Sequence, residues 1–154
     1  MSKIKVGIVG VGNCAKSLVE GIQYYNSNPE DKVGLMYPDI GGYTTTDIEF
    51  VVGFDVDRRK VNRPLTEALR AAPNCAMDHV EEILESGDNS PGAVAPGAMV
   101  YSGPELDGIA PWMLEYPKEV SFRTGAEAAK SYDDIVDLIK KTKVDVLINY
   151  LPVG

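Results

Sequence analysis

The chain has 154 residues and a mass of 16.7 kDa, the size of one ordinary domain. Its 44% hydrophobic and 25% charged residues are typical of a globular protein, which excludes global disorder, a collagen-like repeat and a disulfide scaffold. Fifteen basic and 23 acidic side chains give a net charge of −8. This balance supplies no broad basic face, so we expect no nucleic-acid partner.

Membrane and metal partners are not expected either. No stretch approaches the roughly 20 apolar residues that cross a bilayer, and the first residues do not form a signal peptide, so we predict a cytoplasmic protein. Cys14 and Cys75 share no close spacing, and His79 is the only histidine. Zinc needs three or four clustered ligands, so we predict two reduced thiols, a solvated or capping histidine and no metal site.

The first predicted elements are a strand and a helix. Residues 4–10 are mostly β-branched and apolar, as in a strand buried on both faces of a parallel sheet. Residues 14–25 repeat apolar side chains at helical spacing, which predicts an amphipathic helix. Its buried face would contain Cys14, Ala15, Leu18, Val19, Ile22 and Tyr25, and its other side Lys16, Ser17, Glu20 and Gln23. Residues 26–46 are rich in turn residues and predict an inserted loop, either a lid or an oligomer contact.

The middle of the chain predicts two strands and two helices. Residues 48–55 read as a second strand that ends at Asp55, and Pro64 opens a short helix that carries Leu65, Ala68 and Leu69. A further helix is predicted between Asn74 and Glu85, because Met77, Val80, Ile83 and Leu84 fall on one stripe. Residues 86–98 are expected to form a surface loop, and residues 98–101 a third strand.

The last third contains one well-marked helix. Residues 103–125 are expected to be irregular. Ser131 with Asp134 three residues later predicts an N-cap, and Lys140, Lys141 and Lys143 suit the negative end of the helix dipole. Ile135, Val136, Leu138 and Ile139 would form the buried face of this helix, and residues 144–151 a fourth strand.

This alternation of strands and helices predicts an α/β fold. We expect a Rossmann-like parallel sheet with helices on both faces, formed by residues 1–154 as one domain. No covering helix follows the fourth strand, so the sheet should be truncated there. We therefore expect an N-terminal piece of a longer polypeptide, with any catalytic or oligomerisation domain absent.

The most specific local motif is the G-x-G-x-x-A of residues 10–15, which lies between the predicted first strand and first helix. Gly10 would allow the tight turn, Gly12 the approach of a pyrophosphate, and Ala15 the close packing of the helix on the sheet. The free backbone amides from Asn13 through Cys14 to Ala15 would face the phosphates with the positive end of the helix dipole behind them. The motif predicts dinucleotide binding; a purely structural turn is the alternative.

Asp55 is the candidate acid for the adenosine ribose, because it ends the predicted second strand. It lies 45 residues after Gly10 instead of about 20, so residues 26–46 must be looped out. The alternative is a carboxylate that caps the turn at Asp57. A negative charge at the ribose favours NAD over NADP. Residues 58–60, Arg-Arg-Lys, could hold a 2′-phosphate, although a solvated basic turn is the expected role.

The other candidate residues lie at the carboxyl ends of later strands, where ligands bind in open α/β sheets. They are Asn149, Tyr150, Leu151 and Pro152 after the fourth strand, and Ser102 with Tyr101 at the third. Asn149 either forms a turn with the backbone or faces the cofactor, and Tyr101 and Ser102 carry the same two possibilities.

Several blocks along the chain together resemble one family. They are residues 10–15 (GVGNCA), 20–25 (EGIQYY), 34–36 (GLM), 54–57 (FDVD), 106–109 (LDGI) and 143–154 (KVDVLINYLPVG). In these blocks the chain resembles the prokaryotic myo-inositol-1-phosphate synthases, also called inositol-3-phosphate synthases.

The resemblance implies an NAD-dependent isomerase of inositol and phospholipid biosynthesis. Such an enzyme converts D-glucose 6-phosphate to 1D-myo-inositol 3-phosphate by oxidation, intramolecular aldol cyclisation and reduction with recycled NAD. It further implies that Gly10, Gly12 and Asn13 contact the pyrophosphate, that Asp55 contacts the ribose, and that residues 149–154 approach the nicotinamide.

The catalytic lysines and the tetramer-forming domain of the family would lie beyond residue 154, so the chain alone should hold no catalytic residue and be inactive. Two other hypotheses stay open. One is a stand-alone nucleotide-binding or regulatory module, and the other is the cofactor domain of another NAD(P)-dependent dehydrogenase.

Overall fold

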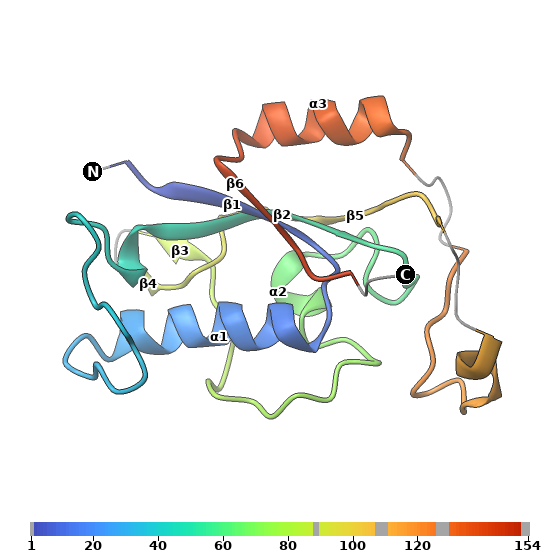
Figure 1. Cartoon of the computed structure of the whole chain (residues 1–154), viewed down its shortest axis with the longest axis horizontal. Helices are drawn as coiled ribbons and strands as arrows, with labels where there is room; N and C mark the ends of the chain where they lie inside the picture. Colours follow the sequence, from blue (N-terminus) through green and yellow to red (C-terminus); the bar gives the residue numbers. More distant parts are fainter. Residues whose placement is uncertain (1, 88–89, 107–110, 126–129, 152–154) are drawn as a thin grey trace.

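Four parallel strands form the main sheet in a computed structural model that describes residues 2–87, 90–106, 111–125 and 130–151 (Figure 1). The strands are β1 (Ile4–Val9), β2 (Ile48–Asp55), β5 (Val100–Ser102) and β6 (Val146–Asn149). They lie in the order β5-β2-β1-β6, and every pairing is parallel. The predicted parallel sheet and its four strands are confirmed.

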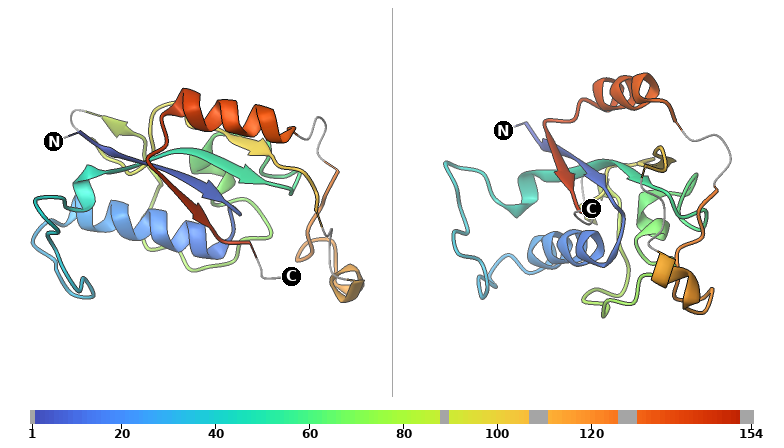
Figure 2. Two further views of the ribbon diagram at one scale, coloured as in Figure 1. Left: turned by 45° about the horizontal axis from the view of Figure 1, so that its top comes forward. Right: turned by 45° about the vertical axis from the view of Figure 1, so that its right-hand side comes forward.

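The two longest helices cover opposite faces of this sheet (Figures 1 and 2). Helix α1 (Asn13–Ser27) follows β1 and covers one face, and α3 (Tyr132–Thr142) precedes β6 and covers the other. The chain adds β2 and β5 on one side of β1 and β6 on the other side. The order therefore reverses next to β1, and ligands bind at such a switch point in open α/β sheets.

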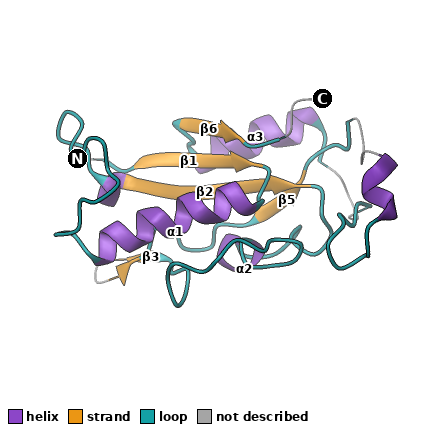
Figure 3. Cartoon of the chain, turned by 60° about the horizontal axis from the view of Figure 1, so that its bottom comes forward, coloured by secondary structure: helices purple, strands orange, loops and turns teal. Residues whose placement is uncertain are grey.

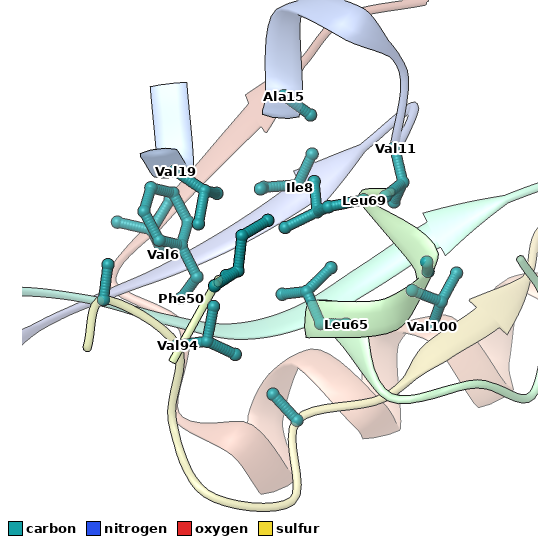
Figure 4. Close-up of a cluster of buried hydrophobic side chains, with 14 of the residues drawn as sticks. Val6, Ile8, Val11, Ala15, Val19, Phe50, Leu65, Leu69, Val94 and Val100 are labelled. Atoms are coloured by element: carbon teal, nitrogen blue, oxygen red, sulfur yellow. The ribbon is translucent and has the colours of Figure 1, made fainter. Parts of the chain in front are cut away.

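The main core lies between the sheet and α1 (Figure 4). Ile8 of β1, Ala15 and Val19 of α1, and Phe50 of β2 are almost completely buried there. Helix α2 (Leu65–Ala68), which is the predicted short helix after Pro64, closes the core with Leu65 and the following Leu69. Apolar burial of this kind is the main stabilising term of the fold.

Helix α3 makes a thinner layer on the other face. Its side chains Ile135, Leu138 and Ile139 are half-buried against Val51, Val52 and Phe54 of β2. Val136, which was predicted to be buried, is 45% exposed, because only a narrow stripe of the helix reaches the sheet. The predicted cap is confirmed: Ser131 Oγ accepts a hydrogen bond from the Asp134 amide, and the Asp134 carboxylate accepts one from the Ser131 amide.

The segment from Asn74 to Leu84 is not helical, so that prediction is wrong. It is irregular and lies alongside α1 (Figure 3). Its backbone bonds to side chains of α1: the His79 amide donates to Glu20 Oε2 over 2.9 Å, and the Leu84 amide donates to Gln23 Oε1 over 2.7 Å. These side chains satisfy backbone groups that a helix would have satisfied internally.

The same contacts correct the predicted faces of α1. Lys16, Glu20 and Gln23 were placed on the outer side of the helix but are only 4%, 0% and 3% exposed. Lys16 donates to the Ala76 carbonyl over 2.6 Å. Cys14, in contrast, was placed on the buried face and is exposed.

Residues 86–98 were expected to form a surface loop, and part of this expectation is wrong. The short strands β3 (Ser86–Gly87) and β4 (Ser90–Pro91) pair antiparallel, after which Ala93 and Val94 are fully buried. The Phe50 amide donates to the Ala93 carbonyl over 2.9 Å, so the chain extends the sheet at β2. Glycine is required at residue 92, because a Cβ there would lie 2.3 Å from the Glu85 carbonyl oxygen.

The remaining described residues form short elements and irregular chain. Between α1 and β2 lie a 3₁₀ helix, η1 (Thr45–Asp47), and an isolated bridge between Ile40 and Tyr43. A second 3₁₀ helix, η2 (Pro111–Glu115), interrupts the stretch that was expected to be irregular. Within the part of the chain that the structure describes, no helix is long and apolar enough to span a bilayer.

Candidate functional site

The glycine-rich loop lies where the ends of three strands meet. The Gly10 amide donates to the Phe54 carbonyl of β2 over 2.8 Å, and the Tyr150 amide after β6 donates to the Val9 carbonyl of β1 over 2.8 Å. Gly10 has a φ of +88°, and a Cβ there would lie 3.3 Å from the Tyr150 carbonyl carbon. A side chain at Gly10 would therefore be strained and would push the β6 end away from the loop.

The first turn of α1 presents backbone amides to open space. Gly12 is the N-cap, no side chain caps the helix, and the first turn has no acidic residue. Among the described residues, no group accepts a hydrogen bond from the amides of Asn13, Cys14 and Ala15. A Cβ on Gly12 would meet no atom within 4 Å. Free amides and the helix dipole together favour an anion at this position.

Asp55 lies directly against the glycine-rich loop. The residue is 9% exposed, and its Oδ2 accepts a hydrogen bond from the Val11 amide over 2.8 Å. Oδ1 accepts from the amides of Val56 and Asp57, each over 2.8 Å, so the turn-capping alternative also describes a contact that is present. A carboxylate has about four acceptor positions, and these three amides leave one for a further donor.

Lys60 was expected in a basic turn and Asn74 at the start of a helix, but both side chains bind the Val11 carbonyl behind the glycine-rich loop, a role that the sequence reasoning missed. Lys60 is fully buried, and its Nζ donates to the Val11 carbonyl over 2.7 Å and to Asn74 Oδ1 over 2.8 Å. The same Nζ lies 3.8 Å from Asp55 Oδ2. Burial lowers the pKa of Lys60, and the carboxylates of Asp55 and Asp57 oppose that shift. The cation supports the glycine-rich loop from the protein side.

The expected solvated basic turn at residues 58–60 is therefore present only at Arg58, which is exposed. Arg59 forms an ion pair with the buried Asp57, over 2.5 Å between Nη2 and Oδ2, and Lys60 is buried behind the loop. A run of three cations in a sequence carries no signal that separates these three environments.

The Asn13 side chain does not face the open side of the loop. Its Oδ1 accepts hydrogen bonds from the amides of Cys75 and Ala76, each over 2.8 Å, so only its backbone amide remains at the helix start. Both thiols are free and exposed, and for Cys14 the exposure contradicts its predicted place on the buried face of the helix. In the described ranges, no three His, Cys, Asp or Glu side chains come together as a possible metal site.

The candidate residues at the ends of β6 and β5 differ in how they lie relative to the glycine-rich loop. Asn149 Oδ1 accepts from the Leu151 amide over 2.8 Å, which is the turn-forming alternative, and Leu151 reaches the space beside Gly10. Ser102 pairs with Asp55 across β5 and β2, but it is 4% exposed and its hydroxyl donates to the Gly103 carbonyl over 3.2 Å. Pro152 lies outside the described residues.

The sheet order and the glycine-rich crossover at the switch point define a Rossmann-like domain. No family model matches the chain. Among curated proteins, it is 39% identical to an inositol-3-phosphate synthase of Corynebacterium glutamicum, over 99% of the chain and 38% of that protein. It is 42% identical to an inositol-3-phosphate synthase of Mycolicibacterium smegmatis, over 99% of the chain and 37% of that protein.

Two solved structures share the fold. The crystal structure of Ari2 matches 99% of this chain over 39% of the Ari2 chain, with a TM-score of 0.68 and 25% identity. A Thermotoga maritima protein described as related to myo-inositol-1-phosphate synthase matches 96% of the chain and 34% of its own, with a TM-score of 0.63 and 17% identity. These two matches support the fold, and the curated relatives confirm the resemblance: the chain is similar in sequence to inositol-3-phosphate synthases over nearly its whole length. It spans 37–38% of the length of the two curated synthases compared above.

Proposed function

We propose that this chain binds NAD at the glycine-rich loop and is the cofactor-binding part of an inositol-3-phosphate synthase. In this proposal the whole enzyme converts D-glucose 6-phosphate to 1D-myo-inositol 3-phosphate, and NAD supplies the chemistry by accepting a hydride and returning it. The family resemblance supports the reaction. The geometry of the loop supports the cofactor.

One observation carries the proposal: free amides of α1, open space over Gly12 and the Asp55 carboxylate adjoin one another at the switch point of the sheet. The amides of Asn13, Cys14 and Ala15 would hold the pyrophosphate. The remaining acceptor position of Asp55 would take a ribose hydroxyl. Asn149 to Leu151, beside Gly10, would border the nicotinamide end.

The first test is Gly12→Val, with Gly21→Val as its matched control. Gly12 lies at the start of α1 and Gly21 lies in the middle of the same helix. A Cβ at either position would meet no atom within 4 Å. The valine at residue 12 should occupy the pyrophosphate space and weaken NAD binding at least about tenfold, or about 1.4 kcal/mol. Calorimetric titration of each variant with NAD measures this difference. Equal affinity of the two variants would overturn the proposed site.

The second test separates the ribose role of Asp55 from its loop-holding role. Asp55→Ala should weaken NAD binding by about 1.5 to 3 kcal/mol, the range for a hydrogen bond to a charged group. It should also lower the thermal midpoint, because the Val11 and Asp57 amides lose their acceptor. A lower midpoint with unchanged NAD affinity, measured on the folded variant, would leave Asp55 a structural residue only.

The reaction itself needs the longest natural polypeptide that contains this chain. Incubated with glucose 6-phosphate and NAD, that polypeptide should form inositol phosphate without net reduction of NAD. NAD binding with no inositol phosphate formed would favour the stand-alone module, and lasting production of NADH from another substrate would favour a different dehydrogenase.

A further inference from the structure

The segment of residues 33–43, between α1 and β2, exposes a dense group of apolar side chains. They belong to Val33, Met36, Tyr37, Ile40 and Tyr43. Val33 and Met36, at 83% and 84%, are the most exposed large apolar residues in the part of the chain that the structure describes. The loop between α1 and β2 extends past the end of α1, at the opposite end of that helix from the glycine-rich loop (Figures 1 and 2). The proposed cofactor site therefore does not account for these side chains.

Two tyrosines of α1 hold the start of this segment in place. The Tyr24 hydroxyl donates to Asp31 Oδ2 over 2.7 Å, and Asp31 Oδ1 accepts from the Val33 amide over 2.9 Å. The Tyr25 hydroxyl donates to the Val33 carbonyl over 2.7 Å. The rings of Tyr24 and Tyr25 pack edge to face, with centroids 5.4 Å apart. Side chains of α1 thus fix the backbone of a stretch whose own apolar side chains stay in water.

The second half of the segment is closed by a backbone bridge. The Ile40 amide donates to the Tyr43 carbonyl over 2.9 Å, and the Tyr43 amide donates to the Ile40 carbonyl over 3.1 Å. Asp39 Oδ1 accepts from the Gly42 amide over 2.9 Å. A simple connection between a helix and a strand needs no such bonds to hold apolar groups in water. Contiguous exposed apolar groups mark an interaction surface.

Acidic residues accompany these apolar side chains. Residues 30–47 contain Glu30, Asp31, Asp39 and Asp47 and one cation, Lys32, so four negative charges less one positive charge leave −3. The whole chain has a net charge of −8. A second copy would bring more negative charge to the segment, and like charges across an interface oppose association. The pattern favours a partner that combines apolar and basic side chains.

We infer that residues 33–43 are an interdomain surface, which an apolar and basic segment of the polypeptide outside residues 1–154 covers in the whole enzyme. The inference rests on the proposed function, since it requires that the chain is part of a longer synthase. More than half of each curated synthase compared above lies outside the region that matches this chain, so such an enzyme has enough polypeptide to form the cover. A partner in the same polypeptide also loses less translational freedom on docking than a separate protein does.

Oxidation of Met36 by hydrogen peroxide tests the cover, because a covered methionine reacts more slowly than an exposed one. Met77, which is 72% exposed, is the internal control. The rates are measured by mass spectrometry of peptides, in the chain of residues 1–154 and in the longest natural polypeptide that contains it. The ratio of the Met36 rate to the Met77 rate should be at least about tenfold lower in the longer polypeptide. An equal ratio in the two proteins would overturn the inference.

A matched pair of lysine substitutions tests the same surface through stability. Met36→Lys places an ammonium against an apolar and basic cover, so it should lower the thermal midpoint of the longer polypeptide by at least about 3 °C. It should leave the midpoint of residues 1–154 unchanged, because Met36 is exposed there. Met77→Lys should leave both midpoints unchanged. Equal midpoints for the two variants of the longer polypeptide would contradict the cover.

Two further measurements separate the occupants and the two proposals. With a photo-reactive methionine at residue 36, cross-links should join peptides of the same copy, whereas cross-links between isotopically heavy and light copies would identify a second copy and overturn the inference. Met36→Lys should keep the NAD affinity of the longer polypeptide. A protected Met36 in a polypeptide that does not bind NAD would contradict only the cofactor site. A freely oxidised Met36 in a polypeptide that binds NAD would contradict only the interdomain surface.

Discussion

The two faces of the sheet are held by different kinds of interaction. On the α1 face, the apolar core is continuous with a row of buried polar side chains, Lys16, Glu20 and Gln23, that bind the segment from Asn74 to Leu84. On the α3 face, the helix has no fully buried residue and depends on its half-buried stripe and on its caps.

This difference shows that two helices of similar amphipathic pattern can serve different purposes. Helix α1 both covers the sheet and replaces the hydrogen bonds that a neighbouring helix would have made for itself, and the start of the same helix carries the candidate anion site. Helix α3 is a simple cover whose ends are locally determined. Substitutions in α1 should therefore affect the fold and the site together, and substitutions in α3 only the stability of one layer.

The largest effect is expected from Glu20→Ala. Glu20 is fully buried, accepts from the His79 amide over 2.9 Å and pairs with Arg70 over 3.2 Å. Its removal leaves the His79 amide without its acceptor. It also takes the nearer carboxylate from Arg70, which keeps the Val80 and Glu81 carbonyls and the more distant Asp78. Together these losses should cost about 3 kcal/mol. Urea unfolding measures the loss. Asp137→Ala, on the exposed side of α3, should cost less than about 0.5 kcal/mol, and similar losses in the two variants would contradict the contrast between the faces.

Lys60→Met should rank second, on the α1 side of the sheet. The methionine keeps the apolar stem but leaves Asn74 Oδ1 without its donor and weakens the support of the Val11 carbonyl. We expect a loss of about 2 kcal/mol in unfolding free energy, typical of a buried acceptor left unsatisfied. NAD affinity of the folded variant should fall as well, because Val11 lies between Gly10 and Gly12. A fully stable variant would show that the buried ammonium is not needed to hold the loop.

Much of the fold could be predicted from local patterns. The β-branched runs located the strands of the main sheet, and the Ser131–Asp134 cap located the start of α3, because each signal depends on residues near one another in the sequence. The prediction of a helix between residues 74 and 85 was wrong for the opposite reason. Its backbone is bound by Glu20 and Gln23, about 60 residues earlier, and no local pattern contains that contact.

In the candidate site, too, the features set by neighbouring residues could be predicted and those set by distant segments could not. The glycine-rich loop and the strand-end acid could be found from spacing, and the structure brings Asp55 within 2.8 Å of the Val11 amide. The burial of Lys60 behind that loop could not be predicted, because its environment is set by Val11 and Asn74, which lie far from it in the chain. Burial decides what a charged side chain does, and composition does not show burial.

Ser131→Ala tests the local determination of α3. The loss of the N-cap oxygen should cost about 1 kcal/mol, visible in urea unfolding at pH 7. Hydrogen bonds from the Ser131 hydroxyl and amide hold the pKa of Asp134 below its usual range. A depressed carboxylate pKa stabilises the fold above the unfolded value of about 3.9 and loses that effect as pH falls through the folded pKa. The difference between wild type and variant should therefore shrink in acid, and a constant difference from pH 7 to pH 2 would exclude the capping box as its source.

The smallest effect, and the only stabilising one, is expected where α3 ends. Lys143 has φ 56° and ψ 46°, a left-handed conformation that a residue with a Cβ adopts only at a cost. Lys143→Gly removes that cost but also removes a cation from the helix end, so the net gain should be about 0.5 kcal/mol. Lys141→Gly, two residues earlier inside the helix, should destabilise by about 1 kcal/mol. Changes of opposite sign in the thermal midpoint of these two variants would confirm that local interactions determine where α3 ends. A lower midpoint in both variants would mean that contacts of the Lys143 side chain stabilise the layer more than its backbone conformation destabilises it.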